Sequence, residues 1–300
     1  MPLPQHLFQR IPALPVDPLE SPQNPPPALH SSFQYCTQVT REHAKSFFFA
    51  SRFLQSRKRD QAYSVYAYCR HIDDLIDERD PHSPQPTTSA LTDENRRIRR
   101  GEHPEAFAPA FSWTCKNREI PISLLDDLVE GCCRDRDTVC IETRKDLEEY
   151  CYFVASVVGL MMCRVFGVSS IDAYPRAVEM GLAMQLTNIL RDIREDFEKD
   201  RIYLPADELA DRNLSVEQLL ETGPNAGWKT YLAEWIQTTR EWYASAETGL
   251  RYLQDRNSAR TARIMGRVYS GILREIEKAD YDVRTRHYVP FHKKVRLAFF

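Results

Sequence analysis

Apolar residues recur at spacings of three and four along nearly the whole chain from Ser31 onward. One example is the set Leu124, Leu125, Leu128 and Val129, which would lie on one side of a helix. We find no stretch with the alternation of apolar and polar residues that is typical of a strand. The pattern therefore predicts an all-α protein with helices over about 33–54, 58–79, 92–101, 104–117, 121–134, 143–167, 171–199, 215–221, 225–256 and 258–280.

The N-terminal segment differs from the rest in composition. Residues 1–30 contain nine of the 19 prolines, and proline removes a backbone donor and disfavours both helix and sheet. We expect a disordered tail over residues 1–30, with a Pro-rich docking segment as the alternative. A single helical domain is expected over residues 31–300.

Composition narrows the classes of function. The formal net charge is -3 and the pI is about 6.3, so no nucleic-acid partner is expected. Neither GxGxxG nor a P-loop sequence occurs, which argues against a Gly-rich phosphate loop. The eight cysteines contain no CxxC pair. They therefore predict buried free thiols in a reducing compartment rather than disulfides or a zinc site.

The longest apolar run, Val154 to Val168, is interrupted by Arg164. It is shorter than the ~20 residues that span a bilayer, so we interpret it as a buried core helix. The N-terminal residues include no apolar stretch typical of a signal peptide. The expected location is the cytoplasm, with membrane contact that is peripheral at most.

Two acidic segments lie within this apolar pattern, one from Tyr66 to Glu78 and the other from Gln185 to Asp196. Each carries two aspartates four residues apart, which on a helix share a face. The pairs are Asp73 with Asp77, and Asp192 with Asp196. Carboxylates on otherwise apolar helices are costly unless cations meet them. Two such helices facing each other would form an acidic cleft that binds divalent cations.

Each aspartate pair belongs to a longer polar stripe whose members are three or four residues apart. The first stripe is Tyr66, Arg70, Asp73 and Asp77, and the second is Gln185, Asn188, Asp192 and Asp196, flanked by Arg191. Such spacing places each stripe on one face of its helix. A polar face on helices rich in Leu and Ile indicates the lining of a central cavity rather than a solvated surface.

The chemistry that suits such a cavity is metal-assisted loss of diphosphate from an allylic carbon. Mg²⁺ prefers oxygen ligands and is usually held by one or two carboxylates plus substrate phosphates. Lys45, Arg70 and Arg191 could contact phosphate oxygens directly. The rest of the pocket would be apolar, to hold a long isoprenoid and to keep water from a carbocation.

Four motifs support a more specific interpretation. They are HAKSF at 43–47, YxxxRxxDDxxD at 66–77, YCYxVA at 150–155 and QLTNILRDxxEDxxxxRIYLP at 185–205. With these motifs the chain resembles the squalene/phytoene synthase family of head-to-head prenyl synthases, from about Tyr35 to Lys294. The resemblance implies a single-domain helical bundle of the isoprenoid-synthase type with a central cavity.

The resemblance also implies roles for individual residues. The positions that match Mg²⁺ ligands are Asp73, Asp77, Asn188, Asp192 and Asp196. The positions that match diphosphate contacts are Tyr66, Arg70, Gln185 and Arg191, then His43, Lys45 and Ser46 for the second diphosphate, and by weaker local motifs Tyr269 and Arg286. The positions that match catalytic residues are the four aspartates and Tyr150. Ala44 departs from the small hydroxyl residue that is frequent in the family.

The implied reaction joins two prenyl diphosphates, farnesyl or geranylgeranyl, through a cyclopropylcarbinyl diphosphate to a linear C30 or C40 hydrocarbon. The sequence from Gln185 to Leu209 is closer to phytoene-type members than to eukaryotic squalene synthases, so a phytoene-type or bacterial C30 enzyme is expected. NADPH would be needed only if the product is squalene. The alternatives are another class I terpenoid synthase and a non-catalytic relative that acts as an assembly or binding factor.

The C-terminal stretch from Tyr288 to Phe300 mixes basic residues with aromatic and aliphatic ones. Basic and aromatic residues together favour contact with an anionic membrane surface. The alternative is that this stretch docks on its own bundle, with Arg286 turned into the site.

Overall fold

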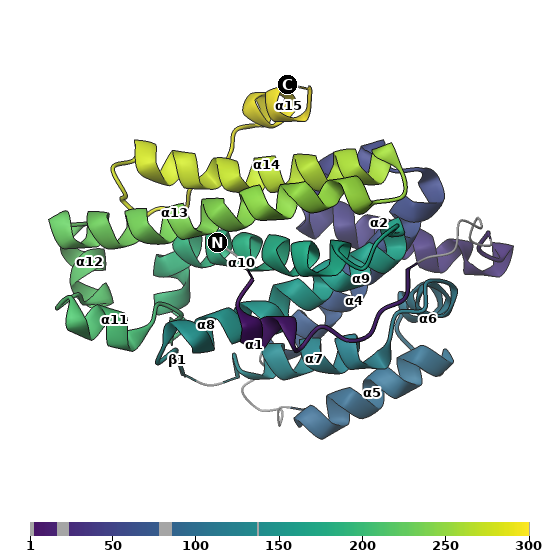
Figure 1. Ribbon diagram of the computed structural model, residues 1–300. Helices are drawn as coiled ribbons and strands as arrows, with labels where there is room; N and C mark the ends of the chain where they lie inside the picture. The colour runs from purple at the N-terminus through teal and green to yellow at the C-terminus, as the bar shows by residue number, and fades with distance from the viewer. Residues whose placement is uncertain (1–2, 17–23, 78–85, 137, 300) are drawn as a thin grey trace.

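The computed structural model describes residues 3–16, 24–77, 86–136 and 138–299, except for the side chains of residues 77, 298 and 299. It is 73% helical with almost no strands, which confirms the all-α fold class (Figure 1). The α-helices are α1 (Gln5–Phe8), α2 (His30–His43), α3 (Lys45–Ala50), α4 (Ser56–Asp77), α5 (Thr88–Arg100), α6 (Ala108–Asn117), α7 (Ile122–Cys133), α8 (Arg144–Cys151), α9 (Val157–Phe166), α10 (Ala173–Phe197), α11 (Ala206–Asp211), α12 (Val216–Thr222), α13 (Ala226–Thr248), α14 (Arg256–Lys278) and α15 (Phe291–Phe299). Shorter elements are the 3-10 helices η1 (Pro27–Leu29), η2 (Ser51–Phe53) and η4 (Gly249–Tyr252), the π-helix η3 (Tyr152–Ser156), and strands β1 (Val139–Cys140) and β2 (Arg201–Ile202).

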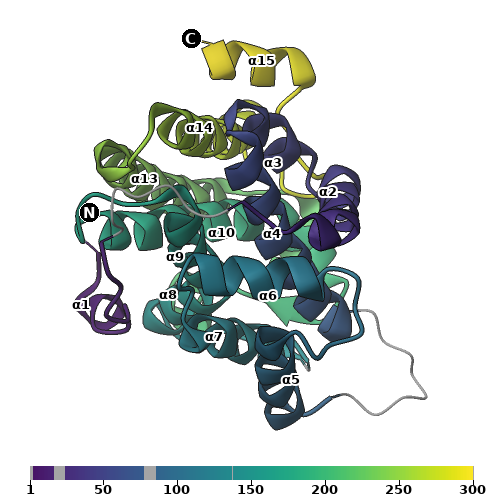
Figure 2. The same cartoon turned by 90° about the vertical axis from the view of Figure 1, so that its right-hand side faces the viewer.

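Helix α10 forms the centre of the bundle. It packs against α13 and α14 on one side and against η3 and α9 on another. Figures 1 and 2 show α13 and α14 above α10, and α7 and α8 below it. Helix α4 packs against α9 and is covered on its outer side by α2 and α6. The two acidic segments, on α4 and α10, are therefore both placed next to α9.

The contact between α10 and η3 depends on a glycine. A Cβ atom at Gly181 would lie 2.4 Å from Cα of Ser156, which is far too close for packed atoms. Residues Tyr152–Ser156 form the π-helix within the longer helical run from Arg144 to Phe166. Single π-turns of this kind are frequent at functional sites.

The run from Arg144 to Phe166 is long and apolar enough to cross a membrane by length and composition. Two thirds of its most apolar window is buried inside the bundle, however, which agrees with the expected core helix. Arg164, the charged residue within this apolar run, is accommodated by hydrogen bonding. Its side chain is buried, and its Nε donates a hydrogen bond of 3.0 Å to the carbonyl of Arg118.

The structure corrects several element boundaries. The helix expected over 33–54 breaks at Ala44, whose backbone angles of φ -125° and ψ 58° are not helical. The break separates α2 from α3 and places the start of α3 beside the cavity described below. Helices α11 and α15 were not predicted, and neither was the parallel pair of two-residue strands that joins Val139 to Arg201. Segments this short carry no periodic signal.

The N-terminal segment is more ordered than its proline content predicts. Among residues 3–16, Leu7 is fully buried and Leu14 nearly so. The carbonyl of Arg10 accepts a 2.9 Å hydrogen bond from the Tyr152 hydroxyl, and the carbonyl of Pro15 accepts one of 2.6 Å from Tyr174. Proline supplies no N–H, but its carbonyl and its neighbours can still pack. The expectation of disorder is therefore wrong for residues 3–16, while residues 1, 2 and 17–23 lie outside the described chain.

Candidate active site

A cavity of about 820 Å³ opens between α3, α4, η3, α9, α10 and α14. Every predicted site residue with a described side chain lines it. These residues are His43, Lys45, Ser46, Tyr66, Arg70, Asp73, Tyr150, Gln185, Asn188, Arg191, Asp192, Asp196, Tyr269 and Arg286. Asp77 is the last residue of α4, and its side chain lies outside the described part of the chain. The structure thus brings together groups that are more than 200 residues apart in sequence.

Helix α4 presents the first polar stripe to the cavity. Asp73 is exposed at the mouth, and its Oδ1 accepts a 3.3 Å hydrogen bond from the Cys132 thiol. Arg70 forms an ion pair with Asp74 one turn along the helix. Burial raises the pKa of the Tyr66 phenol to about 12. Tyr66 is therefore a neutral hydrogen-bonding group at physiological pH.

Helix α10 presents the second stripe, and its regular backbone is interrupted at Asp192. This residue has φ -106° and ψ 15°, so the helix is kinked at the carboxylate itself. Such sparsely populated angles are typical of active-site residues. Two arginines hold the carboxylate: Arg191 binds it through Nε at 2.7 Å, and Arg286 Nε lies 3.1 Å from Oδ1.

The donor atoms around this mouth suit a hard divalent cation such as Mg²⁺. Among the described residues, Oδ1 of Asn188 is a buried oxygen without a hydrogen-bond partner, and its Nδ2 donates to Gln185 at 3.3 Å. Burial, and then the neighbouring Asp192, raise the pKa of Asp196 to about 7. An oxygen without a partner and crowded carboxylates are both conditions that a cation would relieve. The residues present therefore fit the metal that the sequence predicts.

Beside the carboxylates lies a tyrosine pair held by Asp135. The hydroxyls of Tyr150 and Tyr203 donate to the two oxygens of Asp135, each at 2.8 Å, and the rings stack with centroids 4.7 Å apart. Arg201 donates to the Asp135 carbonyl at 2.8 Å. Burial raises the pKa of the Tyr150 phenol far above its usual range. All four residues line the cavity.

Sequence reasoning assigned no role to several of these residues. Tyr203 and Arg201 belong to the quoted motif at 185–205, so their position in that motif was a usable signal. Asp135 follows α7 in a segment without periodicity or a motif, so only the structure places it. Lys199 also lines the cavity and precedes β2.

The third side of the mouth is formed by the start of α3. His43, Lys45 and Ser46 line it, and Lys294 from α15 donates a 2.9 Å hydrogen bond to the Ser46 hydroxyl. Burial, and then Lys45, lower the pKa of Lys294. The C-terminal helix therefore touches the rim of the cavity, as the docking alternative predicts.

Away from the mouth the cavity is apolar. Its walls there carry mainly aliphatic, aromatic and thioether side chains with small residues between them. Representatives are Val158, Met162, Phe166, Met180, Leu253 and Met265. A pocket that is charged at one end and apolar at the other fits a ligand with an anionic head and a hydrocarbon tail.

Comparisons with known proteins agree with this geometry. Residues 40–298 match the family described as squalene/phytoene synthase. The chain is 33% identical to the 15-cis-phytoene synthase of Synechococcus elongatus, with 96% of each chain covered. It is also 33% identical to the phytoene synthase of Arthrospira platensis, which covers 92% of this chain and 94% of the relative.

Solved structures show the same arrangement. A dehydrosqualene synthase crystallised with a ligand superposes with a TM-score of 0.82 at 28% identity, covering 90% of this chain and 95% of the other. The squalene synthase HpnC from Alicyclobacillus acidocaldarius superposes with a TM-score of 0.77 at 25% identity, covering 86% and 97%.

Proposed function

We propose residue roles and a product for this chain, which belongs to the squalene/phytoene synthase family. The protein is a prenyltransferase that joins two prenyl diphosphates head to head. One observation carries the assignment of roles: acidic and basic groups from α3, α4 and α10 share a single cavity with an apolar interior. The charged end suits the diphosphates, and the apolar end suits the prenyl chains.

The aspartates are proposed to act through a metal. Members of this family bind prenyl diphosphates with a divalent metal ion, Mg²⁺. The residues that would hold several such ions are Asp73, Asn188, Asp192 and Asp196, with Asp77 at the end of α4. Bound Mg²⁺ would neutralise the charge that develops on the departing diphosphate.

The basic residues are proposed to bind the diphosphates directly. Arg191 and Arg286 now neutralise Asp192, and Arg70 is paired with Asp74. Their guanidinium groups match phosphate geometry and can exchange a carboxylate for a phosphate oxygen. On the other side of the mouth, His43, Lys45 and Ser46 would hold the second diphosphate. Tyr66, Gln185 and Tyr269 would add neutral hydrogen bonds.

Tyr150 is proposed to stabilise the carbocation through its ring. Its hydroxyl, like that of Tyr203, donates to Asp135, and these hydrogen bonds hold both rings in position. The face of an aromatic ring attracts positive charge. Asp135 then acts as a positioning residue that holds both rings at the cavity wall.

For the product we favour a C40 hydrocarbon made from geranylgeranyl diphosphate. The support is the 33% identity to proteins named phytoene synthase over nearly the full chain. A C30 product from farnesyl diphosphate is the alternative, supported by the dehydrosqualene synthase structure at 28% identity. NADPH would be needed only if the final cation is reduced to squalene.

The C-terminal helix is proposed to touch the membrane that receives the product. Tyr288 and Phe291 are 73% and 68% exposed, and His292 and Arg296 are also exposed. The helix docks through Lys293, which binds Glu275 at 2.9 Å. The helix therefore docks on the bundle while several of its side chains stay exposed, and exposed aromatic and basic groups favour an anionic interface.

We further propose that residues 31–300 form the catalytic domain and that the protein works in the cytoplasm. The eight cysteines are thiols rather than disulfides, and most are buried, as expected in a reducing compartment.

The decisive test is incubation of the purified protein with geranylgeranyl or farnesyl diphosphate, Mg²⁺ and no NADPH, followed by mass spectrometry of the extract. We expect a C40 hydrocarbon from the first substrate and no product in excess EDTA. A C30 product with farnesyl diphosphate alone would overturn the chain-length assignment. Release of only the prenyl alcohols would overturn the residue roles.

A further inference from the structure

A second group of metal-ligating side chains lies outside the cavity, between α4, α5 and the loop that follows α5. His71 belongs to α4, Glu94 to α5 and His103 to the loop, and none of them lines the cavity. We propose that these three residues form a binding site for a divalent transition-metal ion of the zinc class. This site is separate from the magnesium positions at the cavity mouth and does not depend on the proposed function.

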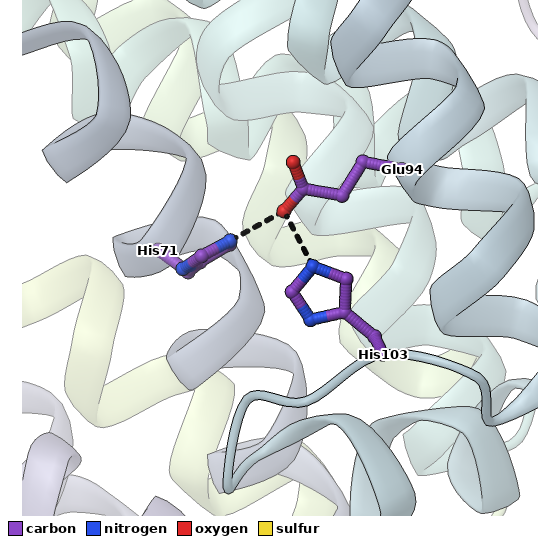
Figure 3. Close-up of side chains that lie close together, drawn as sticks. All are labelled: His71, Glu94 and His103. Carbon is purple, nitrogen blue, oxygen red and sulfur yellow. Dashed lines mark hydrogen bonds and ion pairs between the residues drawn. The ribbon is translucent and has the colours of Figure 1, made fainter.

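The three side chains converge on one point, as Figure 3 shows. Nε2 of His71 lies 2.6 Å from Oε1 of Glu94, and Nε2 of His103 lies 3.2 Å from the same oxygen. One ligand atom from each residue lies within 4.8 Å of the others. A single ion can therefore reach all three after small side-chain movements.

The chemistry of this donor set separates it from the aspartates. Two imidazoles and a carboxylate are ligands that Zn²⁺ accepts readily, with three protein ligands and a water completing a tetrahedron. Mg²⁺ prefers oxygen donors and binds imidazole poorly. The cysteines take no part, so the absence of CxxC pairs in the sequence does not bear on this site.

The surrounding structure holds the ligands in place. Gly101 has φ +78°, a left-handed conformation that favours glycine, and this turn brings His103 back beside Glu94. The ring of Phe107 lies against both imidazoles, with centroids 4.9 Å from His71 and 6.5 Å from His103. The three ligand side chains are only 9–18% exposed. Such ordering lowers the entropic cost of binding an ion.

The position of the proton on the His103 imidazole determines one free-energy cost of binding the metal ion. The Glu105 amide donates to Nδ1 of His103 at 3.3 Å, so the His103 proton is on Nε2 and points at Glu94. To bind a metal through Nε2, His103 must move that proton to Nδ1 and lose the Glu105 contact. Arg97 lies near enough to oppose a cation, and Glu94 and Glu105 favour it. The bond that is lost is long and exposed, so the cost is small.

The bound ion would join three segments of the chain through one atom. It would link α5 and the following loop to the outer side of α4, the helix that carries Tyr66, Arg70 and Asp73 on its cavity side. A ligand that binds only the folded state stabilises it by an amount that grows with the logarithm of its concentration over Kd. The predicted effect is therefore a rise in melting temperature rather than a change in chemistry.

The test titrates the EDTA-stripped full-length protein with ZnSO₄ in excess Mg²⁺, which competes with zinc for the carboxylates at the cavity mouth, and follows binding by calorimetry. The variants are His103→Gln and Glu94→Gln, with His292→Gln as a matched control at an exposed histidine. We expect one zinc per chain, a higher melting temperature with zinc, and a Kd weakened by more than about 100-fold in both site variants, since even outer-shell changes cost ~10–100-fold. The control should bind as the wild type does.

A second measurement needs no variant. Diethyl pyrocarbonate modifies accessible imidazoles, and bound zinc should protect His71 and His103 but leave His292 reactive, as read by mass spectrometry. If zinc protects neither residue, or if the site variants bind zinc as tightly as the wild type, the assignment is wrong.

Discussion

Tyr68 and Asp73 both lie on α4, but their polar atoms meet different surroundings. The Tyr68 hydroxyl donates to Asn95 at 2.7 Å, and Asn95 in turn donates to Asp126 at 3.0 Å. Tyr68 and Asn95 are fully buried, and the Tyr68 ring stacks on Phe111 at 4.3 Å. We refer to Tyr68, Asn95 and Asp126 as the back network. Its hydrogen bonds are made within the protein, so it stabilises the fold without a ligand.

The cavity mouth is organised in the opposite way. Asn188 has a buried oxygen without a partner among the described residues, and Asp196 has a pKa raised by burial and by Asp192. Groups that remain unsatisfied in the folded chain lower its stability and mark a place where a ligand completes them. The comparison teaches that the back network and the cavity mouth differ less in polarity than in whether their polar groups are satisfied.

The largest expected effect comes from removing a carboxylate at the mouth. Asp192→Ala should lower kcat/KM by at least about 100-fold. Removal of a single group that stabilises the charge developing in the transition state usually lowers the rate by about that factor. The melting temperature should change little, since removal of Asp192 also relieves its repulsion of Asp196, and Arg286 is half exposed and can turn to solvent. Asp211→Ala, at an exposed aspartate of α11, is the control. Loss of helical circular dichroism in the Asp192 variant would show that this residue belongs to the fold instead.

The N-terminal segment should behave like the back network and not like the mouth. Leu7→Ala should lower the free energy of unfolding by about 2–5 kcal/mol, the usual cost of removing a buried leucine side chain. Its neighbour Phe8 is 56% exposed, so Phe8→Ala is a matched control that should cost far less. Urea denaturation of the three proteins measures both values. Equal stability of the two variants would mean that residues 3–16 do not pack on the bundle in solution.

The back network itself should affect stability without affecting turnover. Asn95→Ala leaves the Asp126 carboxylate and the Tyr68 hydroxyl short of a partner, and should cost about 1–3 kcal/mol. kcat measured well below the melting temperature should match the wild type. A loss of kcat as large as that in Asp192→Ala would remove the distinction between the back network and the cavity mouth.

The smallest effect concerns a buried carboxyl group beneath α1. Burial raises the pKa of Glu148 to about 7 from its usual 4.5, so the folded protein holds this proton more tightly than the unfolded chain does. Its contribution to stability is complete below pH 4.5 and is lost as the pH rises through 7. Glutamine does not ionise, so Glu148→Gln should not lose stability as the pH rises. At pH 8 the free energy of unfolding of the variant should therefore exceed that of the wild type by about 1–2 kcal/mol. Parallel stability curves from pH 4 to 8 would contradict the shift.

Much of the fold follows from local periodicity, and so does the core of the site. Spacings of three and four place Asp73 and Asp192 on cavity-facing stripes without any knowledge of tertiary structure. Features set by distant contacts could not be predicted in that way. The kink at Asp192, the Asp135 partner of Tyr150 and the packing of residues 3–16 all depend on atoms far away in sequence.

The same limit explains the histidines. His71 and His103 are 32 residues apart and show no ligand spacing, so only the turn at Gly101 and the packing of α5 bring them to Glu94. The expectation for residues 1–30 was wrong in part for a related reason. Proline content indicates a low propensity for helix and sheet. It does not indicate whether nearby leucine side chains pack against the rest of the protein.

The arginine clamp on Asp192 has a thermodynamic consequence. Arg191 and Arg286 act as counter-ions for this carboxylate, so a metal ion that binds it must compete with them. Once displaced, both guanidinium groups are available to a phosphate. Each ligand therefore removes an obstacle to the other, and linkage requires that the metal and the diphosphate raise each other's affinity by the same factor. Either ligand alone should bind weakly, and the enzyme should respond steeply when both are present.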